Sequence, residues 1–277
     1  MTGQLDLDRY GSVLFDLDGT IYLDREPLPG APEFVSSCRR RGARVGFITN
    51  MTWQEKSWCL EGLRAAGIQA RPEELFTAAD AVAHAIRAVG IRRVAFLGGD
   101  GLRAALERRG IHAEAITEST PSDWPSPSFA RSAVAIGMFP GIEEEDLRAT
   151  ATLIERGSPA YVSSVDSGVP TRNGVLPGAA AVLAALERLV DFTPVVCGKP
   201  AAPFAELVYR YVEGAGPTLV VGDSREADVA LAARHGWDSL LVLTGMAQEA
   251  DIAGADPRPT YVAKDLSTAL RRGSRQV

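Results

Sequence analysis

Carboxylates stand directly after two separate apolar runs of the chain. Asp16 and Asp18 follow one run, and Asp223 follows another, with Asp228 five residues later. Two unit charges about 4 Å apart repel by roughly 4 kcal/mol at an effective dielectric of 20. A hard divalent cation between them turns that repulsion into attraction, and Mg²⁺ prefers oxygen ligands of this kind. We therefore expect Asp16, Asp18 and Asp223 to form a Mg²⁺ site.

With Mg²⁺ in place, this set of residues fits phosphoryl transfer. Asp16 would be the nucleophile that forms an aspartyl-phosphate, and the metal would orient the phosphoryl group. The Thr49 hydroxyl and Lys199 would hold the phosphoryl oxygens, because such transfer depends mainly on positioning and charge stabilisation. Asp18 would protonate the leaving oxygen and then deprotonate the attacking water. Gly19 allows the tight turn after the strand.

The elements that must position these residues are strands of a parallel sheet. Apolar runs alternate with amphipathic segments of helical spacing through most of the chain, which predicts an α/β fold with helices on both faces of the sheet. Thr49 and Asn50 end a further run, and Lys199 follows Val195–Cys197. Ligands of open parallel sheets bind outside the carboxyl ends of the strands. We expect all four polar clusters to meet at that edge.

Composition narrows the class of protein. The chain has 277 residues, and its 46% hydrophobic content is enough for a sizeable core. Its net charge is −6, and its basic residues form no stripe with interleaved aromatics, so we expect no nucleic-acid partner. No apolar run has the length of a membrane span and the start of the chain does not resemble a signal peptide, which favours a cytoplasmic protein without a membrane partner.

The thiols are not a metal site. The cysteines Cys38, Cys59 and Cys197 follow no metal-ligand spacing, and reduced, buried thiols are the simplest interpretation. The lack of a Cys/His cluster also argues against zinc.

Four motifs in this order resemble a known family. The segments "DLDGT" (16–20), "TN" (49–50), "GKP" (198–200) and "GDSREAD" (222–228) look like motifs one to four of the haloacid dehalogenase-like (HAD) phosphatases. Their spacing resembles the branch with a large α/β cap, which includes NagD-like and p-nitrophenyl-phosphatase-like enzymes. Each motif alone could be an ordinary turn or a capped helix. None of those interpretations explains all four at strand ends.

The resemblance implies a doubly wound parallel-sheet core with an inserted α/β cap. We expect the core at residues 1–82 and 178–277 and the cap at 83–177. The substrate would be a small phosphorylated metabolite, such as a sugar, polyol or nucleoside phosphate, and a homodimer through the cap is a family-level expectation.

Site residues also follow from the resemblance. Asp16 matches the nucleophile, and Asp18 the acid/base whose backbone carbonyl binds the metal. Thr49 and Asn50 match the phosphate-contacting pair, and Lys199 matches the motif-three lysine.

The last motif supplies two acids under the same resemblance. Asp223 matches the metal-binding acid, and Asp228 matches the acid that steadies the lysine or a metal-bound water. In the cap, Asp166 and Arg172 could face the substrate or could be solvated loop charges.

The surroundings of the motifs depart from the family pattern. Met51 stands where relatives usually carry a second Asn, and Trp53 where a small or basic residue is common. Ala227 replaces a frequent Thr, and Ser164-Val165-Asp166 replaces an Asn-Pro-Asp stretch. Phe139 in "GMFP" replaces a frequent Asp. These changes argue against carrying over a relative's substrate.

These residues leave three alternative functions. A phosphomutase would return the phosphoryl group to another position of the same substrate. A dehalogenase is disfavoured because it needs neither a metal nor an acid two residues after the nucleophile. A binding or regulatory protein without turnover is disfavoured by the complete set of acids.

Overall fold

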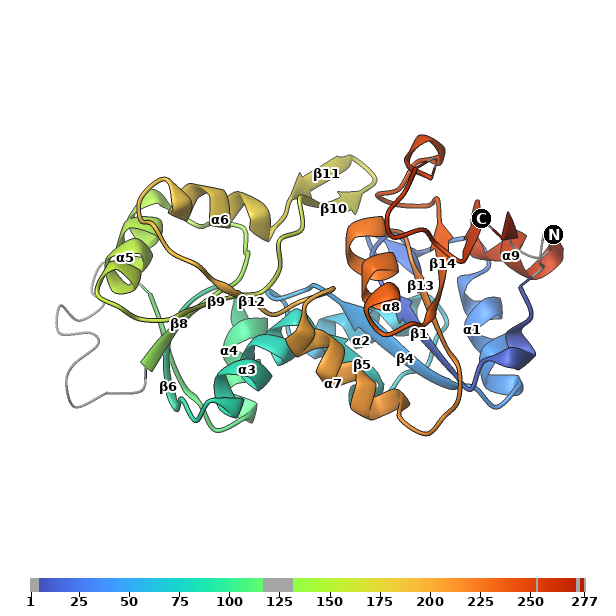
Figure 1. Ribbon diagram of the computed structural model, residues 1–277, viewed down its shortest axis with the longest axis horizontal. Coiled ribbons are helices and arrows are strands. Elements are labelled where there is room, and N and C mark those ends of the chain that lie inside the picture. The colour runs from blue at the N-terminus through green and yellow to red at the C-terminus, as the bar shows by residue number, and fades with distance from the viewer. Residues whose placement is uncertain (1–4, 117–131, 253, 273–274, 277) are drawn as a thin grey trace.

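The computed structural model describes residues 5–116, 132–252, 254–272 and 275–276. Two sheets of mostly parallel strands form two lobes that lie side by side, with both described ends of the chain in the same lobe (Figure 1). The fold is the predicted α/β arrangement, a doubly wound core with an inserted α/β cap.

The core lobe is built on a seven-stranded sheet in the order β16-β15-β14-β13-β1-β4-β5. Every neighbouring pair is parallel except β15 and β16. The chain runs from β1 outward to β4 and β5, and later from β13 outward in the opposite direction, so the strand order reverses between β1 and β13. Such a reversal point is where open α/β sheets bind ligands. The bounds are β1 (Ser12–Asp16), β4 (Arg44–Thr49), β5 (Leu75–Thr77), β13 (Thr218–Gly222), β14 (Asp238–Val242), β15 (Tyr261–Ala263) and β16 (Arg275–Gln276).

Helices cover both faces of this sheet because successive strand residues point to opposite faces. Val13 and Phe15 pack with α1, α2 and α9, whereas Leu14 packs with α3, α7 and α8. The helix bounds are α1 (Ala31–Arg40), α2 (Lys56–Ala65), α3 (Ala78–Ala88), α7 (Ala202–Val212), α8 (Ala230–Arg234) and α9 (Leu266–Arg272).

The second lobe is a five-stranded sheet in the order β12-β9-β8-β6-β7. One face packs on α5 and α6, and the other packs on α4 and on α3, which thereby touches both lobes. The bounds are β6 (Arg93–Leu97), β7 (His112–Ala115), β8 (Ser132–Ile136), β9 (Ala160–Val162), β12 (Val195–Val196), α4 (Asp100–Arg108), α5 (Glu144–Glu155) and α6 (Ala179–Glu187).

Two small hairpins lie where the lobes meet. The β2–β3 hairpin (Tyr22–Leu23 and Glu26–Pro27) belongs to the core. The β10–β11 hairpin (Gly168–Thr171 and Gly174–Pro177) extends from the cap beside the core (Figure 1). The described residues also form four single turns: the 3₁₀ turns η1 (Leu7–Arg9), η2 (Pro72–Glu74) and η5 (Glu249–Asp251), and the π-helical turn η4 (Arg225–Val229).

One part of the expected layout differs from the structure. The strand at Val195–Val196 pairs with β9 of the smaller sheet, at Val195↔Tyr161, and not with the larger sheet. Helix α6 likewise packs against α5 through Val182 and Leu186. Residues 179–196 therefore build the cap, although we expected the core to resume at 178. An apolar run carries no information about which of two parallel sheets it will join.

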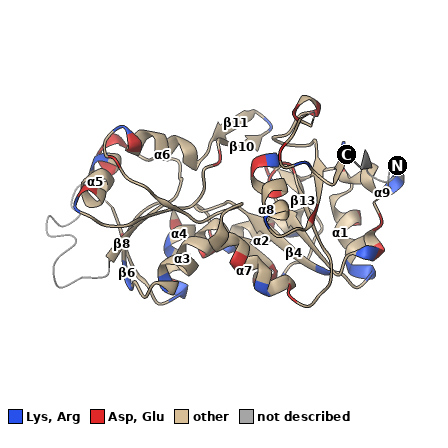
Figure 2. Ribbon diagram, in the orientation of Figure 1, with Lys and Arg blue, Asp and Glu red and all other residues tan. Residues whose placement is uncertain are grey.

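Charged residues are spread over both lobes. Figure 2 shows Lys and Arg on many elements, interspersed with Asp and Glu. None of the helices in the described part of the chain combines the length and the hydropathy that crossing a bilayer requires. Cys38, Cys59 and Cys197 are buried and unpaired, and burial raises the pKa of each thiol to about 12, so they are inert packing residues.

Candidate active site

A cavity of about 500 Å³ opens where the carboxyl ends of β1, β4 and β13 face the cap. Asp16, Asp18, Thr49, Lys199 and the two late aspartates line its inner end, as the sequence predicts. Residues of the cap, including those of the β10–β11 hairpin, line its outer end. Both lobes therefore contribute to one site.

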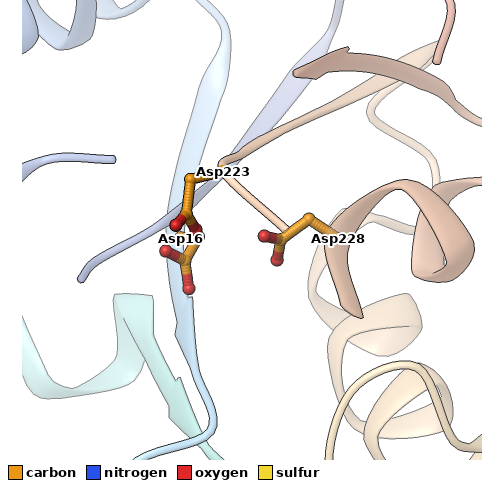
Figure 3. A group of neighbouring side chains, drawn as sticks. All are labelled: Asp16, Asp223 and Asp228. Atoms are coloured by element: carbon orange, nitrogen blue, oxygen red, sulfur yellow. The ribbon is translucent and has the colours of Figure 1, made fainter. Parts of the chain in front are cut away.

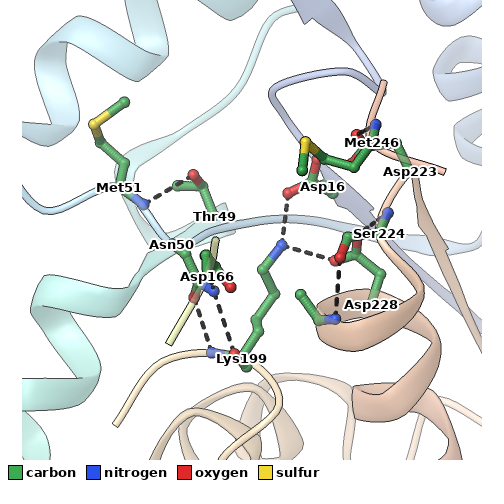
Figure 4. Close-up of polar contacts among 11 residues, drawn as sticks. Asp16, Thr49, Asn50, Met51, Asp166, Lys199, Asp223, Ser224, Asp228 and Met246 are labelled. Carbon is green, nitrogen blue, oxygen red and sulfur yellow. Dashed lines mark hydrogen bonds and ion pairs between the residues drawn. The ribbon is translucent and has the colours of Figure 1, made fainter. Parts of the chain in front are cut away.

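Lys199 holds two of the acids. Its Nζ donates hydrogen bonds to Asp16 Oδ1 at 2.6 Å and to Asp228 Oδ1 at 2.7 Å (Figure 4). The side chain is almost fully buried. Burial alone would lower the pKa of Lys199, but the two carboxylates outweigh it and raise that pKa. Lys199 is therefore a fixed cation inside the site. It follows β12 of the smaller sheet and not a core strand, yet the chain returns it to the core.

The three buried carboxylates form one cluster. Oxygens of Asp16, Asp223 and Asp228 lie within 4.8 Å of one another, and Figure 3 shows the Asp228 carboxylate directed toward the other two. Burial is the main cause that raises the pKa of Asp16, against the opposing effect of Lys199. Burial and the neighbouring Asp228 raise the pKa of Asp223 to about 7. Three carboxylate groups around one ammonium group place an excess of negative charge in a buried part of the cavity wall.

Glycines allow the backbone to approach Asp223. Gly19 has φ +85°, and a Cβ there would lie 2.4 Å from Asp223 Oδ2. A Cβ on Gly245, after β14, would lie 1.9 Å from the same oxygen. That oxygen accepts the backbone N–H of Met246 at 2.6 Å. Side chains at either glycine would push the carboxylate out of the cluster.

Asp18 occupies the turn after β1. The turn is closed by a hydrogen bond from the Gly19 N–H to the Tyr22 carbonyl at 2.9 Å, and by one from the Thr244 hydroxyl to the Gly19 carbonyl at 2.5 Å. Burial, opposed by Lys199, raises the pKa of Asp18 to about 6. A carboxyl with that pKa is a workable proton donor and acceptor near neutral pH.

Thr49 and Asn50, at the end of β4, have different surroundings. Thr49 lies in the cavity wall, and its Oγ1 accepts the Met51 N–H at 3.1 Å, which leaves the hydroxyl proton available to a ligand. The Asn50 side chain instead ties the lobes together. It accepts the Lys199 N–H at 2.8 Å and donates to Asp166 Oδ2 at 2.7 Å and to the Lys199 carbonyl at 3.2 Å. Both amide protons are used, so the side chain positions Lys199 and has none left for phosphate.

The two cap residues singled out in the sequence differ in location. Asp166 lies in the cavity wall, and burial is the main cause that raises its pKa. Arg172 lies at the tip of the β10–β11 hairpin, away from the described cavity lining. Its side chain forms an ion pair with Glu26, and its backbone N–H donates to Asp24 Oδ2 at 2.8 Å. Arg172 therefore fastens the cap hairpin to the β2–β3 hairpin, and its contact with substrate stays a prediction.

The cluster fits a divalent cation. Its donors are all carboxylate oxygens, which suit a hard ion such as Mg²⁺. Asp16 Oδ2 is buried and has no hydrogen-bond partner among the described residues. A buried charged oxygen without a partner is costly, and a cation would satisfy it.

Comparison with known proteins agrees with this geometry. A family model described as haloacid dehalogenase-like hydrolase matches residues 13–112, and a second, described as HAD-hydrolase-like, matches residues 196–269. An acid sugar phosphatase of Staphylococcus aureus is 30% identical over 269 residues, which are 95% of this chain and 98% of that protein. The chain belongs to the HAD-like phosphatases.

Solved structures of other HAD-like phosphatases share the whole fold. The 4-nitrophenylphosphatase of Thermotoga maritima is 27% identical with a TM-score of 0.81, over 95% of this chain and 97% of that one. The glycerol phosphate phosphatase of Mycobacterium tuberculosis, solved with magnesium, is 29% identical with a TM-score of 0.83, over 96% of this chain and 78% of that one. This HAD-like phosphatase is thus an enzyme that hydrolyses phosphoric monoesters.

Two site residues of this phosphatase were not predicted from the sequence. Gly245 and Met246 hold Asp223 in place, and they follow the apolar run at 240–243. That run ends at the same sheet edge as the recognised motifs, so its position was an available signal. Apart from the Thr244 hydroxyl, residues 243–247 carry no acid, lysine or other hydroxyl, and the backbone contacts that they make are not visible in residue types.

Proposed function

We propose that this HAD-like phosphatase hydrolyses a small phosphomonoester with Mg²⁺, through an aspartyl-phosphate on Asp16. The observation that carries the proposal is the environment of the Asp16 carboxylate. One oxygen is fixed by Lys199 at 2.6 Å, and the other is unpartnered among the described residues, in the wall of the cavity. The unpartnered oxygen would be free to hold the cation, and the Lys199 contact would orient the other oxygen for attack on phosphorus.

Asp16 and Asp223 would hold the Mg²⁺ through side-chain oxygens, with Asp18 contributing its backbone carbonyl as the family resemblance implies. Asp228 stands within the same cluster. The bound ion would neutralise the carboxylates and draw charge from the phosphoryl oxygens. Magnesium in the Mycobacterium tuberculosis structure supports this choice of ion.

The reaction uses the residues of the chain in two steps. In the first, an Asp16 carboxylate oxygen attacks phosphorus, the bond from phosphorus to the ester oxygen breaks, and the Asp18 carboxyl gives its proton to that oxygen. In the second, the Asp18 carboxylate takes a proton from water as the water oxygen attacks phosphorus. The bond to Asp16 then breaks, inorganic phosphate leaves and both aspartates return to their starting states.

Lys199 and Thr49 would stabilise the phosphoryl group during both steps. The Lys199 ammonium is buried, so its charge acts at low local dielectric, where it is worth more than in water. The Thr49 hydroxyl retains a proton to donate. Both lie in the cavity wall next to Asp16.

The size of the cavity supports a diffusible substrate. A volume of about 500 Å³ between the lobes suits a small molecule, and the cap would exclude water during transfer. The names of the relatives include an acid sugar phosphatase and a glycerol phosphate phosphatase, which support a small alcohol-derived phosphate ester.

The test is phosphate release from a panel of small phosphate esters, with and without Mg²⁺. We expect turnover that chelation abolishes and Mg²⁺ restores. Asp16→Asn should lower kcat by at least about a thousandfold, because it removes the nucleophile. Asp191→Asn, at an exposed position, is the control and should match the parent. An Asp16→Asn variant as active as the parent would contradict the mechanism.

A further inference from the structure

We propose that the outer part of the cavity is an apolar subsite, so that the preferred substrate carries a carbon-rich leaving group and not a polyhydroxylated one. This inference rests on the proposed function, because a leaving group exists only if the cavity binds a phosphate ester. It concerns the part of the site that lies beyond Asp16 and Lys199.

The β10–β11 hairpin supplies one wall of this subsite. Val169 and Leu176 are directly paired across the two strands, so their side chains lie together on one face of the hairpin. Both residues line the cavity. Leu176 is 48% exposed, so a ligand in the cavity would cover part of its side chain.

Other loops add apolar side chains to the cavity lining. Met51 and Trp53 follow β4 and Met138 follows β8, and all three line the cavity. Methionine side chains adapt to the shape of an apolar ligand. The loop that carries Trp53 is fixed, since the Trp53 carbonyl accepts the Gly101 N–H at 3.2 Å. Met51 stands where the family pattern has an amide.

Several polar side chains of this region already have a partner. Asp166 accepts a hydrogen bond from Asn50 at 2.7 Å, and the Thr52 hydroxyl pairs with the backbone of Met138. Glu226 is bound by the Arg225 guanidinium at 2.9 Å. Among the described residues of this wall, the Ser163 hydroxyl is a buried polar atom without a partner. A sugar would meet these partly used polar groups beside a largely apolar lining, so most of its hydroxyls would face apolar side chains.

Substrate specificity follows from the different free energies of placing methylene groups and hydroxyl groups in an apolar pocket. Each methylene in a fitting apolar pocket is worth about 10-fold or more in discrimination. Hydroxyls that enter without partners lose their bonds to water and gain none. We therefore expect an apolar ester to exceed its polyhydroxylated analogue by at least about tenfold in kcat/KM.

The experiment compares cyclohexylmethyl phosphate with glucose 6-phosphate, in the presence of Mg²⁺. Both are primary alkyl esters with a six-membered ring, so the reacting bond is matched and the ring hydroxyls differ. The proposal predicts a kcat/KM ratio of about 10 or more in favour of cyclohexylmethyl phosphate. A ratio of one or less, with clear turnover of glucose 6-phosphate, overturns the subsite and leaves the phosphatase function standing.

Two variants of one strand locate the preference. Leu176→Asn places an amide in the wall and should reduce the ratio by about threefold or more, through lower kcat/KM for the cyclohexylmethyl ester. Val175→Thr is the control because Val175 is the preceding residue of the strand, points to the other face and does not line the cavity. An equal effect of both variants would contradict the assignment of the wall.

Failure of the proposed function would look different from failure of the subsite. If neither alkyl ester is cleaved and 4-nitrophenyl phosphate, which has an activated leaving group, is also inert with Mg²⁺, the phosphatase mechanism fails and the subsite with it. If 4-nitrophenyl phosphate is cleaved but cyclohexylmethyl phosphate is not preferred, only the subsite is refuted.

Discussion

Replacement of Lys199 by Met should destabilise the metal-free protein by about 3–5 kcal/mol, the usual result of removing one partner from a buried ion pair. At the observed N–O distances of 2.6 and 2.7 Å, each attraction amounts to about 6 kcal/mol at an effective dielectric of 20. Most of that is offset by the cost of dehydrating the three groups. When the ammonium is removed, the Asp16 and Asp228 carboxylates, no more than 4.8 Å apart, still repel by about 3.5 kcal/mol or more.

The pH dependence of this loss has a defined sign. The pKa of Lys199 is raised in the folded state. Its contribution to the free energy of unfolding is therefore fully present at pH 7 and is lost only as pH rises above the ordinary pKa of lysine. Asp16 has its pKa raised, so its ionised form destabilises the fold above its ordinary pKa. In Lys199→Met that penalty grows, and acidification relieves it. The gap between variant and parent should narrow as pH falls from 7.5 toward 5.

The assay is urea unfolding in EDTA, followed by tryptophan fluorescence at both pH values. Arg148→Met is the control because Arg148 pairs with Glu144 on α5, where both side chains are about two-thirds exposed. It should cost about 1 kcal/mol or less. A loss below about 1 kcal/mol for Lys199→Met, or a gap that widens at low pH, would refute the reasoning.

Three further predictions concern the turn, the glycine contact and the hairpin. With a pKa of about 6, protonated Asp18 should give alkyl esters a kcat that falls above pH 6, and Asp18→Asn should abolish this limb in a pH-rate profile. Gly245→Ala, whose Cβ would stand 1.9 Å from Asp223 Oδ2, should lower kcat by roughly a hundredfold and weaken Mg²⁺ binding by titration calorimetry. Arg172→Ala should change kcat/KM by less than about fivefold, since an exposed ion pair is worth at most about 1 kcal/mol; a hundredfold loss would show that it contacts substrate.

Much of the layout could be predicted because it depends on local pattern. The apolar runs before Asp16, Thr49 and Asp223 are buried strands of one sheet, and the polar residues after them meet at its carboxyl edge. Because the carboxyl ends of parallel strands lie at the same edge of a sheet, the order of the motifs was sufficient to predict that these residues meet. Lys199 reached the same point from the other sheet.

What could not be predicted depends on contacts between distant segments. Asn50 contacts Asp166 across 116 positions of sequence, and no spacing rule connects them. Arg172 is a basic residue in a cap loop, and only the position of Glu26 in space shows that it pairs with the core. The apolar wall at Leu176 also needed the fold, because its lining comes from separate loops.

The central claim is that Asp16 carries the phosphoryl group, and chemical trapping tests it most directly. Asp18→Asn with 4-nitrophenyl phosphate and Mg²⁺ should accumulate the intermediate, because nitrophenolate leaves without protonation whereas water activation needs the missing carboxylate. Rapid quenching, borohydride reduction of the acyl phosphate and peptide mass spectrometry should place the reduced side chain at Asp16, in nearly stoichiometric amount. Turnover without a trapped acyl phosphate, or a label at any other residue, would contradict the account.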